Sequence, residues 1–296
     1  MTRDDRAVLD WFIAEATAGL RVNRRAGVSA ALKKPLLLLL VISRFEQHRQ
    51  RGARFSFSEL EGELAELISR YGGRVGQARP NQPYQYLDGQ CGWTVKIPDG
   101  PVGHDRDLPM GVLRSPGTWA ELRADVATLL GTRAAARVEA ANAILAHWWP
   151  DTRHSEILQA LGLPESASAA PRNSEFPKLV LRNWREECAF CGFAASLDGR
   201  AFGLDAAHIR WHSFDGSDES DNGLALCKLH HWAFDAGALT VSGDLRIQVS
   251  PVVVGREVGA IQALESLRDR SLPIPRDTAP ADEHLEWHRA NVFLGD

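Results

Sequence analysis

The sequence predicts an α+β protein of two domains, a mainly helical N-terminal domain and a smaller C-terminal domain held together by a metal ion. Apolar residues recur at helical spacing through residues 1–162. Residues 163–177 are rich in proline, serine and alanine, as linkers often are. Residues 178–296 combine short strand patterns with closely spaced cysteines and histidines. Because 296 residues are enough for two hydrophobic cores, we expect two domains joined by this linker.

The first domain is expected to be helical with one loop-rich insertion. The expected helices cover residues 8–18, a segment that begins near Pro35, and residues 58–70, 119–130, 133–148 and 153–161. Ser58 and Glu61 form the S-x-x-E pattern of a capping box, which predicts where the third helix begins. Between residues 72 and 117, glycine, proline, asparagine and aspartate are frequent, and only short strands such as Trp93–Ile97 fit. Loops carried by a rigid scaffold often hold recognition residues.

The second domain is expected to open with a helix over residues 178–187 and then enter the cysteine and histidine patterns. Strands at 239–241 and 245–249 flank Gly243-Asp244, a typical hairpin turn. A proline-rich segment and a last short helix over residues 284–293 follow. This mixture of short elements predicts a domain too small to depend on its apolar core alone.

The composition is that of an ordinary globular chain, with 44% apolar and 24% charged residues. The richest apolar run, Leu36–Ile42, is far shorter than the roughly 20 residues that a membrane-spanning helix needs, so no membrane partner is expected. The first residues lack the apolar core of a signal peptide. Three of the four cysteines have metal-ligand rather than disulfide spacing, which suits a reducing compartment. We therefore expect the protein in the cytoplasm.

Positive charge is concentrated near the N-terminus, although the whole chain has a net charge of −4. Between Arg21 and Arg54, nine Lys and Arg residues stand against one acid, Glu46. Residues 200–296 have the opposite balance, with nine basic and fifteen acidic residues. A basic region favours phosphate binding, because neutralised phosphates release condensed counterions. The alternative is a solvated cationic helix face without a ligand.

A zinc site is predicted from two pairs of residues. Cys188 and Cys191 have C-x-x-C spacing, and Cys227 and His230 form a second pair with the same spacing. Two such pairs can surround one tetrahedral Zn²⁺ and leave no open position, which is typical of structural zinc. Three ordinary buried cysteines would explain neither the paired spacing nor the histidine. A redox C-x-x-C would need a thioredoxin-like context that this sequence lacks.

A second set of residues overlaps the zinc pattern. It comprises His208 in the segment D-A-A-H-I, Asn222 in D-N-G-L, and His231 directly after the fourth zinc ligand. Over residues 188–237, this order and spacing resemble the HNH endonucleases, in the zinc-braced subset found in McrA-like restriction enzymes. The resemblance implies the ββα-metal fold and phosphodiester hydrolysis with a catalytic divalent metal such as Mg²⁺ or Mn²⁺. An imidazole suits proton transfer in this reaction because its pKa lies near neutrality.

The resemblance also implies a role for each of these residues. His208 is expected to be the general base, and His231 a ligand of the catalytic metal. Asn222 is expected to orient the general base or the loop that carries it. Asp235 lies one helical turn beyond His231 and is expected to be a second metal ligand.

One position departs from the family pattern. Many HNH nucleases have an aspartate or histidine immediately before the general base as a metal ligand, whereas this chain has Ala207. Asp205 lies two residues earlier, on the same side of the predicted strand as Ala207. We therefore expect Asp205 to take the role of that metal ligand.

The N-terminal domain resembles, over residues 1–160, the sulfur-binding domains joined to HNH nucleases that act on phosphorothioate-modified DNA. The resemblance is carried by Arg24, Arg25, Lys33 and the leucine run after it, by the segment from Arg79 through Pro80 and Pro83 to Tyr84, and by the strand start at Trp93. It implies that Arg24, Arg25, Lys33 and Arg79 hold the DNA backbone or read guanine edges. His104 and Arg106, on the following loop, are further candidates.

The three residues Pro80, Pro83 and Tyr84 suggest how sulfur would be recognised. Sulfur in place of a non-bridging phosphate oxygen is larger, more polarisable and less strongly hydrated. An apolar cup of these side chains would favour sulfur and leave an ordinary phosphate oxygen poorly solvated. The alternative is that Pro80–Pro83 is a turn with Tyr84 packed inward.

The leading functional hypothesis is a modification-dependent, type IV-like restriction endonuclease whose partner is double-stranded phosphorothioate DNA. Cleavage of both strands suggests a homodimer. One alternative is an HNH endonuclease that selects methylated or unmodified sites, although a modified-base reader would be expected to have an aromatic stack for a flipped base. Another is a zinc-stabilised DNA-binding protein without catalysis, which would have no need of His208, Asn222 and His231 together.

Overall fold

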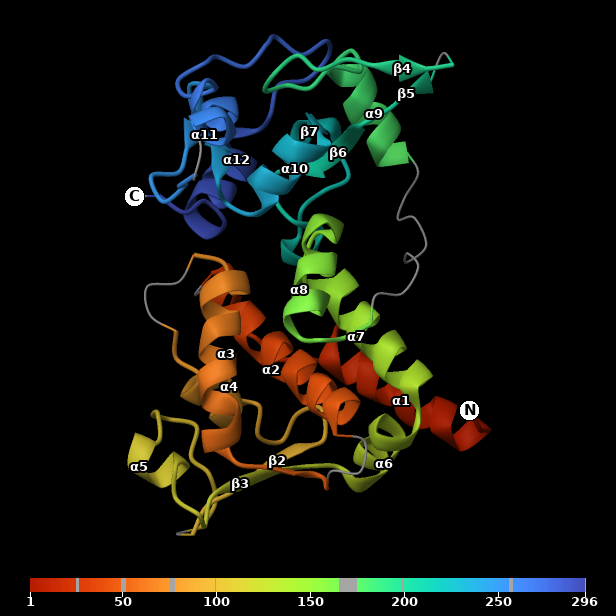
Figure 1. Cartoon of the computed structure of the whole chain (residues 1–296), viewed down its shortest axis with the longest axis vertical. Helices are drawn as coiled ribbons and strands as arrows, with labels where there is room; N and C mark the ends of the chain where they lie inside the picture. The colour runs from red at the N-terminus through yellow and green to blue at the C-terminus, as the bar shows by residue number, and fades with distance from the viewer. Residues whose placement is uncertain are drawn as a thin grey trace. The chain divides into compact units, whose positions relative to one another are not determined.

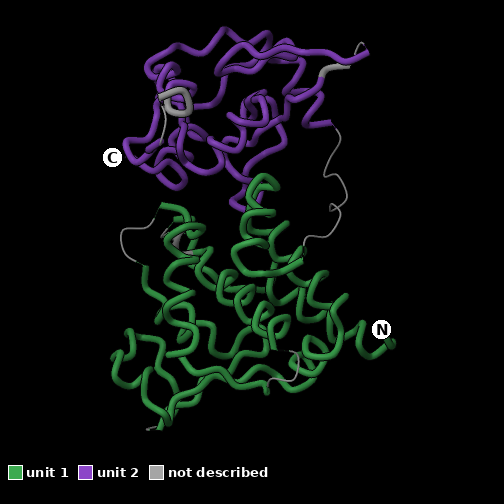
Figure 2. Tube along the Cα trace, viewed as in Figure 1, with its two compact units in different colours: residues 1–169 green, residues 170–296 purple. Residues whose placement is uncertain are grey.

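The computed structural model describes residues 1–24, 27–48, 52–74, 78–98, 100–164, 175–198, 200–255 and 258–295. The chain forms two compact units, Met1–Ala169 and Ala170–Asp296 (Figure 2). Most of the expected linker and the candidate DNA-binding residue Arg25 lie outside the described residues. Within the described part of the chain, no helix has both the length and the apolar character needed to cross a bilayer.

The first unit is mainly helical and carries one small sheet (Figure 1). Its helices are α1 (Arg3–Ala16), α2 (Val28–Gln47), α3 (Phe57–Tyr71), α4 (Asn81–Tyr86), α5 (Met110–Leu113), α6 (Ala124–Thr132), α7 (Ala134–Trp148) and α8 (His154–Ala160). Its strands are β1 (Arg54–Phe55), β2 (Trp93–Lys96) and β3 (Trp119–Leu122). The predicted class, a mainly helical domain followed by an α+β domain, is confirmed.

Helix α2 lies at the centre of the first unit because its leucine run is buried. Residues 36–42 are all 0% exposed, and α2 packs against α3 and α7. Pro35 was expected in a first helical turn, but α2 begins at Val28 and contains Pro35 in its interior. An interior proline costs about 3 kcal/mol. Burial of one large apolar side chain contributes about 1.5–3 kcal/mol, so the buried run outweighs that cost.

The N-cap of helix α3 lies two residues before the predicted one, and the helix begins at Phe57 rather than Ser58. Its N-cap is Ser56, whose Oγ accepts the backbone N–H of Glu59 at 3.3 Å, while the Glu59 carboxylate accepts the N–H of Ser56 at 3.2 Å. This capping box replaces the one expected from Ser58 and Glu61. The earlier start brings Phe57 into the helix, where its side chain is 0% exposed, and core burial explains the difference.

Strand β3 lies between β1 and β2 in an antiparallel sheet. A helix was predicted over residues 119–130, but residues 119–122 form β3 and α6 begins only at Ala124. Positions 120 and 122 are buried, whereas positions 119 and 121 are partly exposed. This alternation is the pattern of a strand with one covered face, and it is too short to stand out in the sequence.

The described part of the second unit contains three antiparallel pairs of short strands, interleaved with helices (Figure 1). Its helices are α9 (Glu175–Asn183), α10 (Lys228–Asp235), α11 (Val258–Glu265) and α12 (Asp282–Asn291). Its strands are β4 (Ser196–Leu197), β5 (Arg200–Ala201), β6 (Leu204–His208), β7 (Gly223–Cys227), β8 (Leu239–Val241) and β9 (Ile247–Val249).

The centre of this unit has the order strand, strand, helix. Strand β6 pairs antiparallel with β7, so that His208 lies opposite Gly223 and Leu204 opposite Cys227. Helix α10 follows β7 directly and packs against both strands. This is the ββα arrangement that the sequence resemblance implied, and it brings the end of β6 next to one face of α10.

Helix α9 covers the β6–β7 pair. A side chain at position 223 would collide with Val180 of α9, so Gly223 permits this close approach. The helix was predicted over residues 178–187 but occupies 175–183. Its end is explained by Arg185 and Glu186, whose φ angles of 54° and 55° do not continue a right-handed helix.

Candidate functional site

Three cysteines and one histidine of the second unit converge on one point. Cys188 and Cys191 lie in a tight turn that is closed by the Gly192 N–H, which donates to the Cys188 carbonyl at 2.8 Å. Cys227 is the N-cap of α10, and His230 lies in its first turn. The four potential ligand atoms lie within 4.8 Å of one another. His230 Nδ1 is 3.4 Å from Cys188 Sγ and 3.3 Å from Cys227 Sγ.

This cluster fits a structural Zn²⁺. Tetrahedral Zn–S and Zn–N bonds of about 2.3 and 2.0 Å place neighbouring sulfur and nitrogen ligands about 3.5 Å apart, close to the observed distances. Zinc binds thiolates. Burial alone would raise the pKa of Cys188, but the hydrogen bond to His230 and nearby backbone groups lower it to about 6. The donor set of three sulfurs and one nitrogen is closed, so it suits a structural rather than a catalytic role.

A second cluster lies where β6 meets α10. Strand β6 carries Asp205 and His208, and α10 carries His231 and Asp235. His231 Nδ1 is 3.2 Å from Asp205 Oδ2, and His231 Nε2 is 3.2 Å from Asp235 Oδ2. The other oxygen of Asp205 accepts from Lys228 Nζ at 2.7 Å. The predicted residues are thus brought together, with His231 between two carboxylates.

The arrangement divides the three predicted metal ligands. Asp205 Oδ2 and His231 Nδ1 have the spacing of two adjacent ligands of an octahedral divalent ion, about 3 Å. Asp235 lies on the opposite nitrogen of the same ring, and its side chain is only 1% exposed. Asp205, at 27% exposed, faces the more accessible side. The geometry therefore favours Asp205 with His231 as ligands, and Asp235 as the carboxylate that orients His231 from behind.

The two carboxylates also set the protonation of His231. Burial alone would lower its pKa, but Asp235 and Asp205 raise the pKa of His231 to about 9. A divalent ion has to displace that proton before it can bind the ring nitrogen. Metal binding at this cluster is therefore expected to tighten as the pH rises.

His208 lies at the end of β6 and is held on several sides. Its Nε2 is 2.9 Å from Asp218 Oδ1, and its ring stacks on Phe176 with centroids 3.8 Å apart. The ring of His212 lies 6.4 Å away. Burial lowers the pKa of His208 below its ordinary value, although Asp218 opposes this shift. A lowered pKa keeps the imidazole neutral near pH 7, which is the form that a general base needs.

Asn222 is fully buried and fixes the loop that follows His208. Its Oδ1 accepts the backbone N–H of Arg210 at 2.8 Å. Its Nδ2 donates to the carbonyls of Arg210 at 3.0 Å and of Ser217 at 2.8 Å. One amide thus joins both ends of the loop. All three bonds go to backbone groups of the loop, so Asn222 acts by holding that loop.

Sequence reasoning missed Phe176 and Asp218. Phe176 falls inside residues 163–177, which were predicted to be a linker, whereas α9 already begins at Glu175. Asp218 is one of several acids in the loop after β6, and the sequence does not show which of them faces the histidine. The β6–β7 pairing and the path of the loop single it out.

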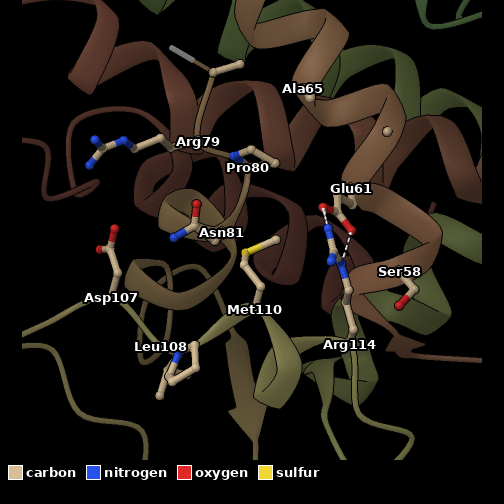
Figure 3. Close-up of a pocket in the computed structure, with 13 residues that line it drawn as sticks. Ser58, Glu61, Ala65, Arg79, Pro80, Asn81, Asp107, Leu108, Met110 and Arg114 are labelled. Carbon is tan, nitrogen blue, oxygen red and sulfur yellow. Dashed lines mark hydrogen bonds and ion pairs between the residues drawn. The ribbon is translucent and has the colours of Figure 1, made fainter.

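The first unit has a pocket of about 1020 Å³ between α3 and the segments that lead into α4 and α5 (Figure 3). Its apolar lining includes Ala65, Pro80, Leu108, Pro109 and Met110. Figure 3 shows polar groups of Arg79, Asn81 and Asp107 along one side. On the other side, Arg114 forms two hydrogen bonds with Glu61, of 2.6 and 2.9 Å. Two of the predicted sulfur- and DNA-binding residues, Arg79 and Pro80, therefore line one pocket.

Tyr84 has a different position from the one expected. Its side chain is 0% exposed, its hydroxyl donates to the Phe55 carbonyl at 2.8 Å, and its ring contacts Phe57 and Trp93. Burial raises the pKa of Tyr84 well above its ordinary value. The expectation that Tyr84 forms a wall of an exposed cup is wrong, because the ring belongs to the core. Pro83 is also buried, and neither residue lines the pocket.

The remaining predicted recognition residues lie on the surface of the first unit. Lys33 Nζ donates to Gln82 Oε1 at 3.0 Å, and burial together with the positive charge of Arg79 lowers its pKa. Lys33 and Arg79 therefore lie close enough to repel each other. Arg24, His104 and Arg106 are exposed, the last two on the loop that leads to the pocket residues 107–110.

Comparisons with known proteins match both units. Residues 12–166 match the family model described as ScoMcrA-like, DNA sulfur-binding domain, and residues 188–242 match that of the HNH endonuclease. A comparison with curated proteins finds no match.

Solved structures give more distant similarities. The sulfur binding domain of SprMcrA complexed with phosphorothioated DNA has 22% identity and a TM-score of 0.44, and the match covers 55% of this chain and 98% of that one. The corresponding ScoMcrA complex has 22% identity and a TM-score of 0.41, with coverage of 55% and 97%. The modification dependent TagI restriction endonuclease has 25% identity and a TM-score of 0.33, with coverage of 45% and 41%. The match thus spans less than half the length of the TagI chain.

Proposed function

Because the chain belongs to the ScoMcrA-like DNA sulfur-binding domain family, we propose that it is a modification-dependent, type IV-like restriction endonuclease. It binds phosphorothioate-modified double-stranded DNA through the first unit and hydrolyses phosphodiester bonds with the second. The observation that carries the proposal is the pairing, within one chain, of that family match with an HNH endonuclease match whose histidines and carboxylates cluster on a ββα element.

The cluster supports a hydrolytic mechanism in which each residue has a separate task. His208 accepts a proton from the attacking water, and its lowered pKa keeps it available for this task near pH 7. Asn222 holds the loop after β6 in one conformation. Asp205 and His231 would hold the divalent metal, and Asp235 orients His231. When bound, that metal would supply positive charge to stabilise the negative charge on the phosphate and leaving oxygen.

The pocket of the first unit supports a revised account of sulfur recognition. We place the sulfur against Pro80 and the apolar side chains of Leu108 and Met110, in the position that the sequence analysis gave to Tyr84. Moving a phosphate oxygen from water to an apolar lining costs more free energy than moving the less strongly hydrated sulfur there. Arg79 and the nearby Lys33 would then bind the adjacent backbone by charge, without reading sequence.

The binding half of the proposal is tested with the full-length His208→Ala variant, which is expected to bind without cutting. Two duplexes of one sequence are compared, one with a single phosphorothioate and one without. We expect the modified duplex to bind at least tenfold more tightly, or about 1.4 kcal/mol. Met110→Ala should reduce the preference for the modified duplex. Arg79→Ala should weaken binding to both duplexes and make the slope of log K against log salt concentration shallower by about one.

Arg133→Ala provides the matched control, because Arg133 carries the same charge but pairs with Asp5 and does not line the pocket. It should leave both affinities unchanged. Equal affinity of the His208→Ala protein for the two duplexes would refute the proposed sulfur recognition.

Two finer points belong to the same proposal. One HNH centre per chain cuts one strand, so we propose a homodimer as the form that cuts both strands. Light scattering of the His208→Ala protein on modified duplex should give two chains per DNA. Because the zinc thiolates need reducing conditions, we propose the cytoplasm as the site of action.

A further inference from the structure

We propose that Asp218 is a positioning residue for the general base, holding His208 in the tautomer with its proton on Nε2. The inference rests on the proposed nuclease function. Asp218 lies in the loop between β6 and β7, ten residues beyond His208. It belongs to neither predicted ligand set, and one of its carboxylate oxygens lies against Nε2 of the imidazole.

The contact is short and directional. His208 Nε2 lies 2.9 Å from Asp218 Oδ1, within the range of a charge-assisted hydrogen bond from an imidazole N–H to a carboxylate. The two side chains are 23% and 33% exposed, so water weakens the interaction less than it would a surface pair. Because a carboxylate can only accept, the proton of a neutral His208 is placed on Nε2, and the lone pair on Nδ1.

The ring has little freedom to turn away from Asp218. Phe176 covers one face of His208 at a centroid distance of 3.8 Å and an interplanar angle of 13°. Tilting the imidazole out of its plane would therefore break the stack, and a 180° flip within that plane would break the hydrogen bond. The geometry leaves Nδ1 as the nitrogen that accepts a proton.

The loop is built to hold Asp218 in place. The carbonyl of Ser217, the residue before it, accepts from the buried Asn222 amide at 2.8 Å. The Gly216 N–H donates to the Trp211 carbonyl at 3.1 Å, and a side chain at position 216 would collide with the Arg210 carbonyl. Asn222 thus fixes the residue next to Asp218, and its effect on catalysis runs partly through that carboxylate.

In the proposed step, a water O–H bond breaks and its proton binds Nδ1 of His208, while the water oxygen forms a bond to phosphorus. The bond from phosphorus to the leaving 3′ oxygen breaks, and that oxygen gains a proton from solvent. Asp218 stays ionised and stabilises the imidazolium that forms, which is how a carboxylate assists a histidine base in other hydrolases. His212 and Asp235 are the other titratable groups whose charge acts on this ring.

The test uses the full-length protein with Asp218→Asn, which keeps the size of the side chain and removes its charge. We expect kcat on modified duplex to fall at least tenfold, with the duplex Kd within twofold of wild type. The acidic limb of the pH–rate profile should move to lower pH, because loss of the carboxylate removes an interaction that raises the pKa of His208. Asp218→Glu should recover part of the loss.

Glu219→Gln is the matched control, since it removes the same charge from the neighbouring residue. It should leave kcat and the profile unchanged. Unchanged zinc content and thermal unfolding of Asp218→Asn would show that the domain is intact. Equal kcat for Asp218→Asn and wild type, or equal losses for Asp218→Asn and Glu219→Gln, would overturn the proposal.

A second readout does not depend on cleavage. Long-range ¹H–¹⁵N spectra of the zinc-loaded wild type without added Mg²⁺ or Mn²⁺ should show the His208 proton on Nε2, and those of Asp218→Asn should show a mixture of tautomers. If wild type cut neither duplex but kept the Nε2 tautomer, the proposed function would fail and the Asp218 contact would stand. A wild-type proton on Nδ1 would overturn the inference even in an active enzyme.

Discussion

The ring of Phe176 lies almost parallel to the ring of His208, with centroids 3.8 Å apart and planes inclined by 13°. Phe176 is in the first turn of α9, within the last residues of the predicted linker 163–177. Gly223 lets α9 approach β7 closely enough for this contact. The orientation of the candidate general base therefore depends on the placement of the helix that enters the nuclease unit.

Replacing Phe176 by leucine should separate this orienting role from packing. Phe176 is 3% exposed, and a large apolar replacement in a core site costs about 1.5 kcal/mol or less. We expect kcat to fall about tenfold because the imidazole gains freedom to rotate. Leu179→Ala, in the same helix at a half-exposed position, should have little effect on either quantity. Cleavage kinetics measure kcat, and thermal unfolding measures stability. An unchanged kcat of Phe176→Leu would contradict the proposed orientation of His208 by Phe176.

The cysteine–histidine cluster should make the second unit depend on zinc. We expect one Zn²⁺ per chain by elemental analysis and loss of the second unit's folding transition after chelation, because metal binding energy becomes folding energy. Cys188→Ser should abolish both. Cys91→Ala is the control, since Cys91 lies in the first unit outside the cluster. Full zinc content in Cys188→Ser would exclude that ligand.

Asn222→Ala should lower both stability and activity. The change removes three hydrogen bonds from a residue that is 0% exposed and leaves two backbone carbonyls and one N–H without that partner. Each unsatisfied buried group costs about 1–3 kcal/mol. We expect at least a hundredfold loss of kcat with unchanged zinc content, measured under conditions where the variant remains folded. A variant with normal kcat would show that the loop does not need this clamp.

His288 should make the second unit sensitive to acid. The ring is 0% exposed, donates from Nε2 to the Phe234 carbonyl at 3.2 Å and accepts at Nδ1 from Thr240 Oγ1 at 2.9 Å. Burial lowers the pKa of His288 from 6.5 to about 3. The unfolded chain therefore binds a proton that the folded chain excludes, so stability is complete above pH 6.5 and is lost as the pH falls toward 3.

This linkage is measured against His288→Gln, which cannot titrate. Denaturant unfolding of the second unit at pH 7 and pH 5 should show that wild type loses about 2 kcal/mol more than the variant over this interval. The comparison cancels the carboxylates that titrate in both proteins. Equal losses in the two proteins would mean that His288 is charged in the folded state.

Local patterns in the sequence indicated the nuclease domain more reliably than they predicted element boundaries. The zinc ligands and the His208, Asn222 and His231 set lie within about fifty residues, so their order and spacing carried the resemblance to HNH endonucleases, and the family match confirms that resemblance. The predicted element boundaries were wrong where burial in the tertiary structure determines where a helix begins. Ser56 rather than Ser58 caps α3 because Phe57 enters the core.

Roles that depend on direction could not be read from spacing. Asp205 and Asp235 were both expected to bind the metal, and only the fold shows that they contact opposite nitrogens of His231. Tyr84 was expected in an apolar cup with Pro80 and Pro83, yet its ring packs in the core against Phe57 of α3 and Trp93 of β2. Long-range packing, which the sequence pattern does not encode locally, decided both cases.

The most direct test of the account is cleavage by the wild-type protein. Two duplexes of identical sequence, one carrying a phosphorothioate in each strand and one unmodified, are incubated with the zinc-loaded protein and Mg²⁺ or Mn²⁺. The account predicts that only the modified duplex is cut, and that His208→Ala cuts neither. Equal cutting of both duplexes, or no cutting of the modified duplex with either metal, would contradict it.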